Sequence, residues 1–200
     1  MNGSGSSDRT EACSAKGRAE AELIARLKAY DEAAIRQVYR LYSDGIYRYA
    51  LYQSGDPSLA EDVAGEVFAR MIESIASYTY RGAPFSAWLY RIARNLVIDH
   101  RRRGARLRPL EAADEARTPA DDPVELAERR LTWEELRVVM SELTDEQRQV
   151  VVLKFVENLD NAEVAEIIGK SEGSVKSLQH RALRTLRRLL ERRGSHARRA

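Results

Sequence analysis

Apolar side chains recur every three or four residues along most of this chain, and that spacing predicts amphipathic helices. The clearest pattern follows Pro84, where a helix is expected to run to about Arg103, with Gly104 just beyond it. Trp88 belongs to its apolar stripe and is therefore expected in the core. The stripe consists of Phe85, Trp88, Leu89, Ile92, Ala93 and Leu96. Three earlier helices are expected at residues 19–29, after the capping residue Asp31, and from Asp56-Pro57 to about Ser77.

The second half of the chain contains further helix starts with recognisable caps. Asp122-Pro123 places proline at the first helical position, with Glu125 behind it, and predicts a helix to about Ser141. Residues 144–147 read Thr-Asp-Glu-Gln, which is a capping box for a helix that reaches about residue 156. The sequence therefore predicts an all-α protein.

A tight turn joins two helices between residues 160 and 190. Asp160 can cap a helix Asn161–Ile168, Gly169 supplies the left-handed residue that ends it, and Ser171 can cap the next helix. This arrangement is typical of a helix-turn-helix, whose second helix enters the major groove with its first turns. An ordinary helical hairpin with solvated arginines is the alternative. The exposed side of the second helix is expected to carry Ser174, Lys176, Ser177, Gln179, His180, Arg181, Arg184 and Arg188.

Positive charge is concentrated around that second helix. The stretch Lys170–Ala200 holds ten lysines and arginines against only Glu172 and Glu191, whereas the whole chain has a formal net charge of +2. A basic cluster of this kind is the electrostatic signature of a nucleic-acid-binding protein. The charge distribution therefore favours DNA binding over a merely solvated surface.

The helices group into two small domains joined by a flexible linker. Residues 1–18 are small and polar, which predicts a disordered tail, and residues 104–122 contain prolines, alanines and acids without an apolar stripe. The helical domains are expected at residues 19–103 and 123–193, with the helix-turn-helix in the second. Residues 194–200 form a basic tail.

Several classes of protein are disfavoured by the composition. No apolar run approaches the length of a membrane span, so membrane insertion is not expected. The N-terminus lacks the apolar core of a signal peptide, and the single cysteine, Cys13, cannot form an internal disulfide, so a cytoplasmic protein is expected. The histidines are scattered, and no phosphate-binding glycine loop or nucleophile motif is present. We therefore expect no metal, no cofactor and no enzymatic activity.

Two features of the first domain are candidates for binding a partner. The helix after Pro57 has an acidic side that includes Asp62 and Glu66, which either is simply solvated or docks on a basic partner. The loop that follows carries Tyr78, Tyr80 and Arg81, and such residues can stack on unpaired bases. Spacing alone does not choose between these interpretations.

Taken in order, these residues resemble a family. Residues 60–70 (AEDVAGEVFAR) and 85–99 (FSAWLYRIARNLVID) resemble region 2 of the bacterial group IV, or extracytoplasmic-function, sigma factors of RNA polymerase. Residues 143–148 (LTDEQR), 163–169 (EVAEIIG) and 173–177 (GSVKS) resemble region 4 of that family. Gly65 departs from the family, which commonly has glutamine there, and the long middle domain of primary sigma factors is absent.

The resemblance implies roles that composition could not reveal. The acidic helix would dock on the β′ clamp helices of core RNA polymerase through Asp62 and Glu66. The next loop and helix would bind the −10 element of promoter DNA through Tyr78, Tyr80, Arg81, Arg91, Arg94 and Asn95. Region 4 would rest on the β flap and read the −35 element through Ser174, Lys176, Ser177, Gln179, His180 and Arg181, with Arg184, Arg187 and Arg188 at phosphates. An anti-sigma factor is a further candidate partner.

Two other classes remain open at this point. A stand-alone helix-turn-helix regulator would bind duplex DNA without polymerase and would usually dimerise on a palindrome. That class leaves the acidic helix and the loop tyrosines without a purpose. An enzyme acting on nucleic acid would need a metal or nucleophile cluster, and the matched blocks contain none.

Overall fold

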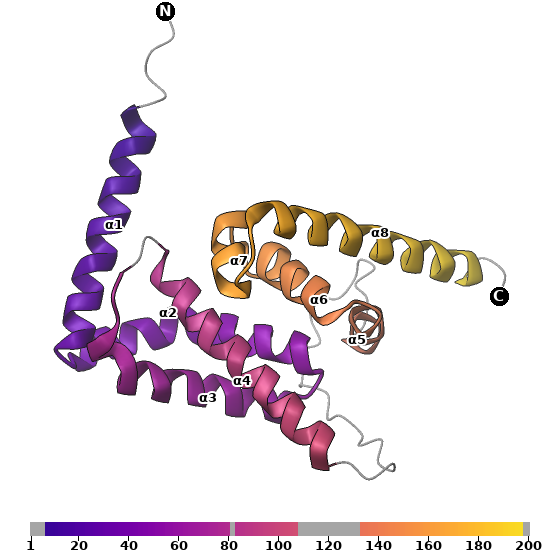
Figure 1. The fold of residues 1–200 in the computed structure, drawn as a ribbon, viewed down its shortest axis with the longest axis horizontal. Helices are drawn as coiled ribbons and strands as arrows, with labels where there is room; N and C mark the ends of the chain where they lie inside the picture. The colour runs from indigo at the N-terminus through magenta and orange to yellow at the C-terminus, as the bar shows by residue number, and fades with distance from the viewer. Residues whose placement is uncertain (1–6, 81–82, 108–132, 198–200) are drawn as a thin grey trace, which may run out of the picture.

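A computed structural model describes the chain over residues 7–80, 83–107 and 133–197. Every regular element in these ranges is helical, as the sequence predicts (Figure 1). An N-terminal domain contains α1 to α4, and a C-terminal domain contains α5 to α8. The elements are α1 (Ser7–Lys28), α2 (Glu32–Ser54), α3 (Pro57–Ser74), the 3-10 turn η1 (Ile75–Ser77), α4 (Phe85–Leu107), α5 (Trp133–Ser141), α6 (Asp145–Val151), the π-helical turn η2 (Val152–Val156), α7 (Asn161–Ile168) and α8 (Glu172–Ala197).

The helix starts of the N-terminal domain follow from their caps. The Asp31 carboxylate accepts a 2.8 Å hydrogen bond from the amide of Ala33, and Asp56 accepts a 2.9 Å bond from the amide of Ser58. These bonds satisfy amides that have no partner within the helix. Gly55 ends α2 with a positive φ of 73°, a conformation that costs glycine little. The predicted starts of α2 and α3 are therefore confirmed.

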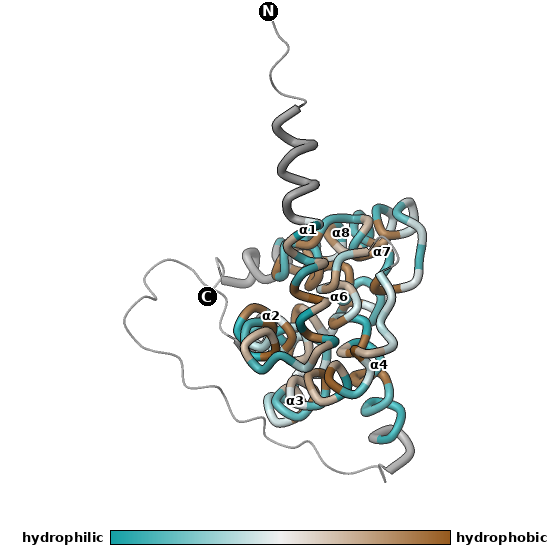
Figure 2. Tube along the Cα trace, turned by 90° about the vertical axis from the view of Figure 1, so that its left-hand side faces the viewer, coloured by the Kyte–Doolittle hydropathy of each residue, from teal (hydrophilic) through white to brown (hydrophobic). Residues whose placement is uncertain are grey.

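The core of the N-terminal domain lies where α2, α3 and α4 pack together. The predicted stripes of α3 and α4 face this core. Along the trace of these helices, hydrophobic residues (brown) alternate with hydrophilic ones (teal) (Figure 2). Beside the core, near the η1 turn, Tyr42, Tyr78, Phe85 and Trp88 form a connected aromatic cluster. The start of α4 is thus held by aromatic packing as well as by its apolar stripe.

The C-terminal domain is built around the predicted helix-turn-helix. Thr144 and Gln147 form a reciprocal capping box at α6, and Asp160 and Glu163 form another at α7. Gly169 ends α7 with a φ of 69°, and the Ser171 hydroxyl accepts a 3.3 Å hydrogen bond from the amide of Ser174. The helices α6, α7 and α8 enclose a core that includes Val150, Leu153, Val164, Ile168, Val175, Leu178 and Ala182.

Three helix boundaries differ from the sequence-based expectation. The helix α1 begins at Ser7, so residues 7–18 are helical and the prediction of a disordered tail is wrong for them. Six of these twelve residues are alanine, glutamate, lysine or arginine, and their helix propensity outweighs that of the serines and Gly17. Likewise, α4 continues through Gly104 to Leu107, and α8 continues to Ala197. The rest of the predicted linker, the tail at residues 1–6 and the helix start at Asp122 lie outside the described residues.

The two domains lie against each other. The helix α4 contacts α2 and α3 on one side and α7 on the other, and it crosses the molecule between the two domains (Figure 1). The helix α2 also contacts α6. This packing places the basic side of α4 next to the C-terminal domain, which the sequence did not predict.

Candidate nucleic-acid interface

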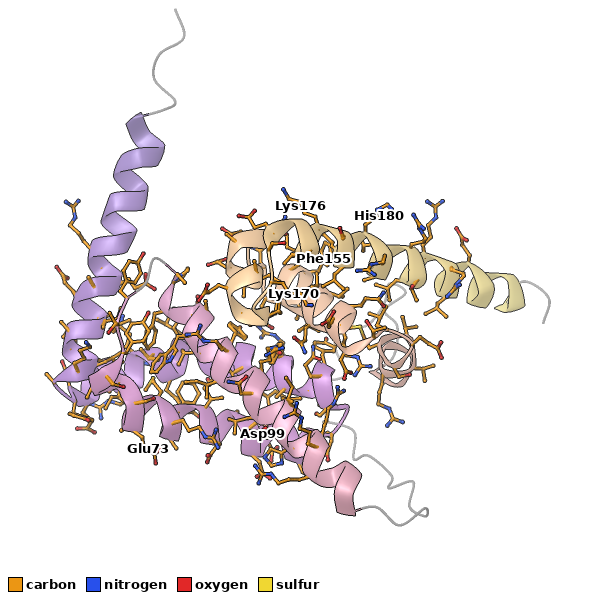
Figure 3. All side chains as sticks on the ribbon, viewed as in Figure 1. Glu73, Asp99, Phe155, Lys170, Lys176 and His180 are labelled. Atoms are coloured by element: carbon orange, nitrogen blue, oxygen red, sulfur yellow. The ribbon has the colours of Figure 1, made fainter. Side chains whose placement is uncertain are left out.

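The second helix of the helix-turn-helix presents a polar, basic side to solvent. Val175, Leu178 and Ala182 are buried against the domain, and the intervening positions face outwards. Lys176 and His180 project from the outer edge of α8 (Figure 3). Of the residues expected on this face, Gln179 is half-buried, whereas Ser174, Lys176, Ser177, His180, Arg181, Arg184, Arg187 and Arg188 are exposed.

Apart from the contact between the Ser171 and Ser174 hydroxyls at 3.0 Å, the polar contacts described on this face are made within α8. The Ser177 hydroxyl donates to the Gly173 carbonyl at 3.0 Å, Arg184 lies 3.0 Å from the Nε2 atom of His180, and Arg187 pairs with Glu191 at 2.9 Å. All of these groups belong to one exposed helix. Such contacts are worth only a few tenths of a kcal/mol. DNA phosphates and bases could therefore replace them at little cost.

A second candidate site lies where η1 meets the start of α4. A pocket of about 330 Å³ opens there, and its lining includes Tyr78, Pro84, Trp88 and Arg91. The Tyr78 and Trp88 ring centroids are 4.7 Å apart, so one wall of the pocket is aromatic. Trp88 was expected in the core, but it is half-buried and lines this pocket. Its position on an apolar stripe gave no signal of that second role.

The two loop tyrosines differ in their surroundings. Tyr80 is exposed, with 58% of its surface accessible, so its ring is available to a ligand. Tyr78 is half-buried in the aromatic cluster, and this burial raises the pKa of its phenol above the usual value. Arg81, the third predicted residue of this loop, lies outside the described residues. The loop therefore offers one packed and one accessible aromatic ring.

The basic side of α4 meets the C-terminal domain. Arg91 forms an ion pair with Glu166 of α7 at 3.1 Å, and the Nε atom of Arg94 donates to Gln149 of α6 at 3.0 Å. Asn95, which directly follows Arg94, is exposed. Two of the residues that the sequence assigned to DNA are thus engaged by protein in this structure.

The acidic side of α3 is open to solvent. Asp62 and Glu66 are exposed, and Glu66 forms an ion pair with Arg70 one turn later at 2.8 Å. Gly65 lies between them, and a Cβ atom there would meet no other atom within 4 Å. Nothing in the fold requires a glycine at this position, and the surface around it is unobstructed.

Glu157 joins the two domains at the end of the η2 turn. Its carboxylate accepts hydrogen bonds from the Tyr90 hydroxyl at 2.7 Å and from Arg48 at 3.0 and 3.1 Å. Burial raises the pKa of Tyr90, and the neighbouring carboxylate adds to the increase. The hydrogen bond to Glu157 raises the pKa of Arg48. No sequence motif singled out Glu157 or Arg48.

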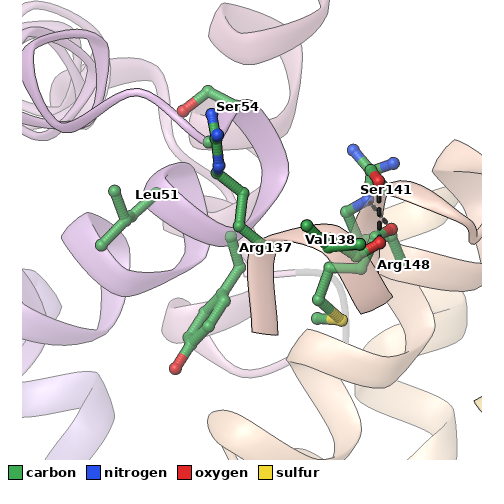
Figure 4. Close-up of a pocket in the computed structure, with 9 residues that line it drawn as sticks. Leu51, Ser54, Arg137, Val138, Ser141 and Arg148 are labelled. Carbon is green, nitrogen blue, oxygen red and sulfur yellow. Dashed lines mark hydrogen bonds between the residues drawn. The ribbon is translucent and has the colours of Figure 1, made fainter. Parts of the chain in front are cut away.

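A second polar junction lies at the C-terminal end of α2. Arg148 of α6 donates to the backbone carbonyls of Gln53 at 3.1 Å and Met140 at 2.9 Å, and Arg101 also donates to the Gln53 carbonyl. Burial lowers the pKa of Arg148. A pocket of about 300 Å³ lies beside this junction, between Leu51 and Ser54 of α2 and the helix α5 (Figure 4).

The described residues contain neither a metal-binding cluster nor a membrane-spanning helix. Among them, His, Cys, Asp and Glu side chains form no group of three that could hold a metal ion. None of the helices in the described ranges combines the length and the apolar character that crossing a bilayer requires.

The sequence matches known proteins over both domains. The family model for Sigma-70 region 2 matches residues 38–107, and that for Sigma-70 region 4 matches residues 133–186. The chain is 39% identical over 176 residues to the ECF RNA polymerase sigma factor BldN of Streptomyces coelicolor; the match covers 84% of this chain and 65% of that protein. It is 32% identical over 166 residues to the ECF RNA polymerase sigma factor SigL of Mycobacterium tuberculosis, covering 82% of this chain and 92% of SigL.

Solved structures with the same fold include two proteins in complexes with partner proteins. CnrH, in complex with the cytosolic domain of CnrY, superposes with a TM-score of 0.67 at 22% identity, covering 86% of this chain and 97% of CnrH. The Bartonella quintana sigma factor RpoE, in complex with the anti-sigma factor NepR, gives a TM-score of 0.66 at 22% identity, covering 78% of this chain and 96% of RpoE. At this identity the likeness concerns the fold.

Proposed function

This chain belongs to the extracytoplasmic-function sigma factors of RNA polymerase, and from that membership we propose that it binds core RNA polymerase and directs promoter-specific transcription initiation. One observation carries the proposal: both DNA-contacting regions of the family occur in this chain, in the family's order. The exposed basic helix of the C-terminal domain and the aromatic pocket of the N-terminal domain suit two different forms of DNA. The first suits duplex and the second suits unpaired bases.

The duplex element would be read by α8. Its first turns lie beyond the tight turn at Gly169, which is where a recognition helix approaches base edges. We assign the base-facing role to Ser174, Lys176, Ser177, Gln179, His180 and Arg181. Arg184, Arg187 and Arg188 lie one or two turns further along and would contact phosphates, which position a protein without specifying sequence.

The unwound element would bind at the start of α4. The exposed ring of Tyr80 and the pocket walled by Tyr78 and Trp88 provide apolar surfaces on which an unstacked base can rest. Arg81, Arg91, Arg94 and Asn95 would contact the backbone and base edges of that strand. Trp88 is an addition to the residues that the sequence suggested.

Contacts with polymerase are proposed on both domains. Asp62 and Glu66 lie exposed on α3, where the family docks on the β′ clamp helices, and the C-terminal domain would rest on the β flap. Such a factor acts without catalysing a reaction itself and works in the cytoplasm. Because RpoE is in complex with the anti-sigma factor NepR in its solved structure, we also propose an anti-sigma factor as a partner.

Run-off transcription tests the proposal. Core RNA polymerase alone, and core polymerase with the full chain, would be given a pool of promoter fragments from the source genome. Discrete run-off products that require the chain are expected. If the products are the same with and without the chain, but the chain by itself binds duplex DNA tightly, the chain is a stand-alone regulator.

A pre-melted template tests the assignment of the −10 residues. Tyr80→Ala and Asn95→Ala should impair opening of a duplex promoter more than binding to a template with an artificial bubble, because stacking requires a base that has left the helix. The expected loss is about 1–3 kcal/mol per stacked base. Unchanged binding of both variants to the bubble template, where the bases are already unpaired, would show that these residues do not act on unpaired bases.

A further inference from the structure

The pocket of about 300 Å³ at the C-terminal end of α2 combines apolar surface with positive charge (Figure 4). Its apolar walls include Leu51, Tyr52 and Val138, and its charged groups are Arg137 of α5 and Arg148 of α6. None of the described residues in its lining is acidic. Small-molecule sites span about 300–1,000 Å³, so this pocket has room for a small organic ligand.

Both serines of the lining already have partners. The Ser54 hydroxyl donates to a backbone carbonyl of α2 at 2.8 Å, and the Ser141 hydroxyl donates to a backbone carbonyl of α5 at 2.8 Å. The Gly55 amide likewise donates to a carbonyl of α2. These groups are not available to a ligand while their bonds last. Recognition of an anion would therefore fall mainly to the two arginines.

Arg148 is buried without a full counter-charge. Only 11% of its side chain is accessible, and it donates three hydrogen bonds, all to backbone carbonyls, at 2.9 to 3.2 Å. A guanidinium has more donors than these bonds use. The Asp145 carboxylate lies 3.8 Å away, which is longer than a hydrogen bond. Burial lowers the pKa of Arg148, and the positive charge of Arg101 lowers it further.

Hydrogen-bond donors exceed acceptors around Arg148. Gln53, whose carbonyl Arg148 and Arg101 share, is buried, and its Nε2 atom has no hydrogen-bond partner among the described groups. The hydroxyl of Tyr49, one turn earlier in α2, is also buried and unpartnered there. Buried donors without acceptors cost free energy. The junction is therefore electrostatically suited to an added anion.

Arg137 supplies a second guanidinium from another helix. It reaches from α5 towards Ser54 at the end of α2, and its Cδ atom would lie 3.5 Å from a Cβ atom at Gly55 (Figure 4). Arginine forms charge-assisted hydrogen bonds with phosphate oxygens. Two arginines on separate helices suit a group with several charged oxygens. Phosphate is such a group.

We propose that this pocket binds a small organic phosphate, whose anionic group contacts Arg137 and Arg148 and whose organic part lies against Leu51, Tyr52 and Val138. The site is separate from the surfaces assigned to promoter DNA and to polymerase. It does not depend on the proposed function. A ligand that binds only the folded chain also stabilises it, so occupancy is visible in the thermal midpoint.

Calorimetric titration of the full chain tests the site with three probes. Phenyl phosphate carries both the anion and an apolar ring, inorganic phosphate carries only the anion, and phenol carries only the ring. Ionic strength is held constant, because salt screens attraction to charged surfaces. Phenyl phosphate should bind saturably at one site and more tightly than either other probe. Absence of saturable binding, or equally tight binding of phenol, would overturn the proposal.

Two variants locate the binding within the pocket. Arg137→Gln removes one guanidinium, and Val138→Glu places a carboxylate on an exposed part of the wall. Each should weaken phenyl phosphate binding by at least about tenfold, because a hydrogen bond to a charged group is lost or an anion is repelled. Arg148 is left unchanged, since three backbone carbonyls depend on it.

Matched controls separate pocket binding from adsorption to basic surface. Arg40→Gln removes the same charge from an exposed position of α2, and Val138→Gln changes the wall without adding charge. Both should bind phenyl phosphate nearly as the unmodified chain does, and circular dichroism would verify the helical content of every variant. Phenyl phosphate should raise the thermal midpoint of the unmodified chain and the controls only. Undiminished binding in Arg137→Gln and Val138→Glu would place the anion elsewhere and overturn the proposal.

Discussion

The carboxylate of Glu20 in α1 accepts a hydrogen bond from the backbone amide of Phe85, the first residue of α4. The two residues are 65 positions apart, so α1 supplies the cap of a distant helix. The first amides of a helix have no partner inside it, and a carboxylate at that end also interacts favourably with the helix dipole. Glu20 therefore fixes the start of α4, beside the aromatic pocket.

Removing this cap should destabilise the N-terminal domain. Glu20→Ala is expected to lower the free energy of unfolding by about 1–2 kcal/mol, because it leaves the Phe85 amide without its acceptor. Glu20→Gln keeps an oxygen acceptor and should cost less. Urea denaturation measures both, with Glu22→Ala, an exposed position on the same helix, as the control. Equal stabilities for Glu20→Ala and Glu22→Ala would show that the bond contributes nothing.

Charge reversal on α3 should prevent docking on core polymerase. The double change Asp62→Lys and Glu66→Lys places two positive charges on an exposed face and should abolish co-purification with core enzyme, while circular dichroism stays helical. Exposed charges at the edge of an interface mainly set the association rate and its salt dependence. Glu22→Lys with Glu142→Lys gives the same charge change elsewhere. Undiminished co-purification of the α3 variant would refute this docking face.

Substitutions on α8 should impair promoter binding in two distinguishable ways. Gln179→Ala or Arg181→Ala should cost about 1–3 kcal/mol on the cognate −35 element and relax the preference at one base position. Arg187→Ala should weaken binding to all sequences and reduce the salt slope by about one. Transcription of a promoter library with each variant measures the base preference. If the Gln179→Ala and Arg181→Ala variants keep the base preference of the unmodified chain, α8 binds DNA only through its positive charge and does not read the sequence.

Alkaline pH should weaken the fold through Tyr90. Its pKa is raised in the folded chain by burial and by Glu157, whereas an unfolded tyrosine ionises near about pH 10. Above that pH the unfolded chain has lost a proton that the folded chain retains, so the free energy of unfolding falls as pH rises. Urea denaturation from about pH 9 to about pH 11 should show a shallower fall for Tyr90→Phe than for the unmodified chain. If the free energy of unfolding falls equally steeply with pH in both chains, Tyr90 does not cause this pH dependence.

Local chemistry explains which parts of the fold the sequence could predict. Asp31, Asp56, Thr144 and Asp160 each precede a helix start and cap it in the structure. Gly169 takes the left-handed conformation that a tight turn requires. Caps, turns and apolar stripes depend on neighbours within a few residues, so a single sequence reveals them. The extension of α1 to Ser7 was not predicted, because residues 7–18 mix good helix formers with an equal number of small or polar residues that are poorer ones.

Long-range contacts could not be predicted in the same way. Nothing in the sequence connects Arg48 with Glu157, 109 positions later, or Arg91 with Glu166. Each of these residues occupies a polar position, on a helix or just beyond one, that is equally compatible with solvent. Trp88 was assigned to the core because its spacing fits the stripe, although the stripe's edge lines a pocket. The need for glycine at position 45 could not be predicted either, because the group that leaves no room for a Cβ atom there is the hydroxyl of Tyr90, on another helix.

Promoter opening by the complete system tests the central claim most directly. Permanganate reactivity of thymines would be followed on a supercoiled promoter with core polymerase, with the chain, and with both together. Reactive thymines confined to the −10 region are predicted only when both proteins are present. Reactive thymines in the −10 region with core polymerase alone would contradict the account. So would the absence of reactive thymines with both proteins, if the chain alone binds the duplex promoter.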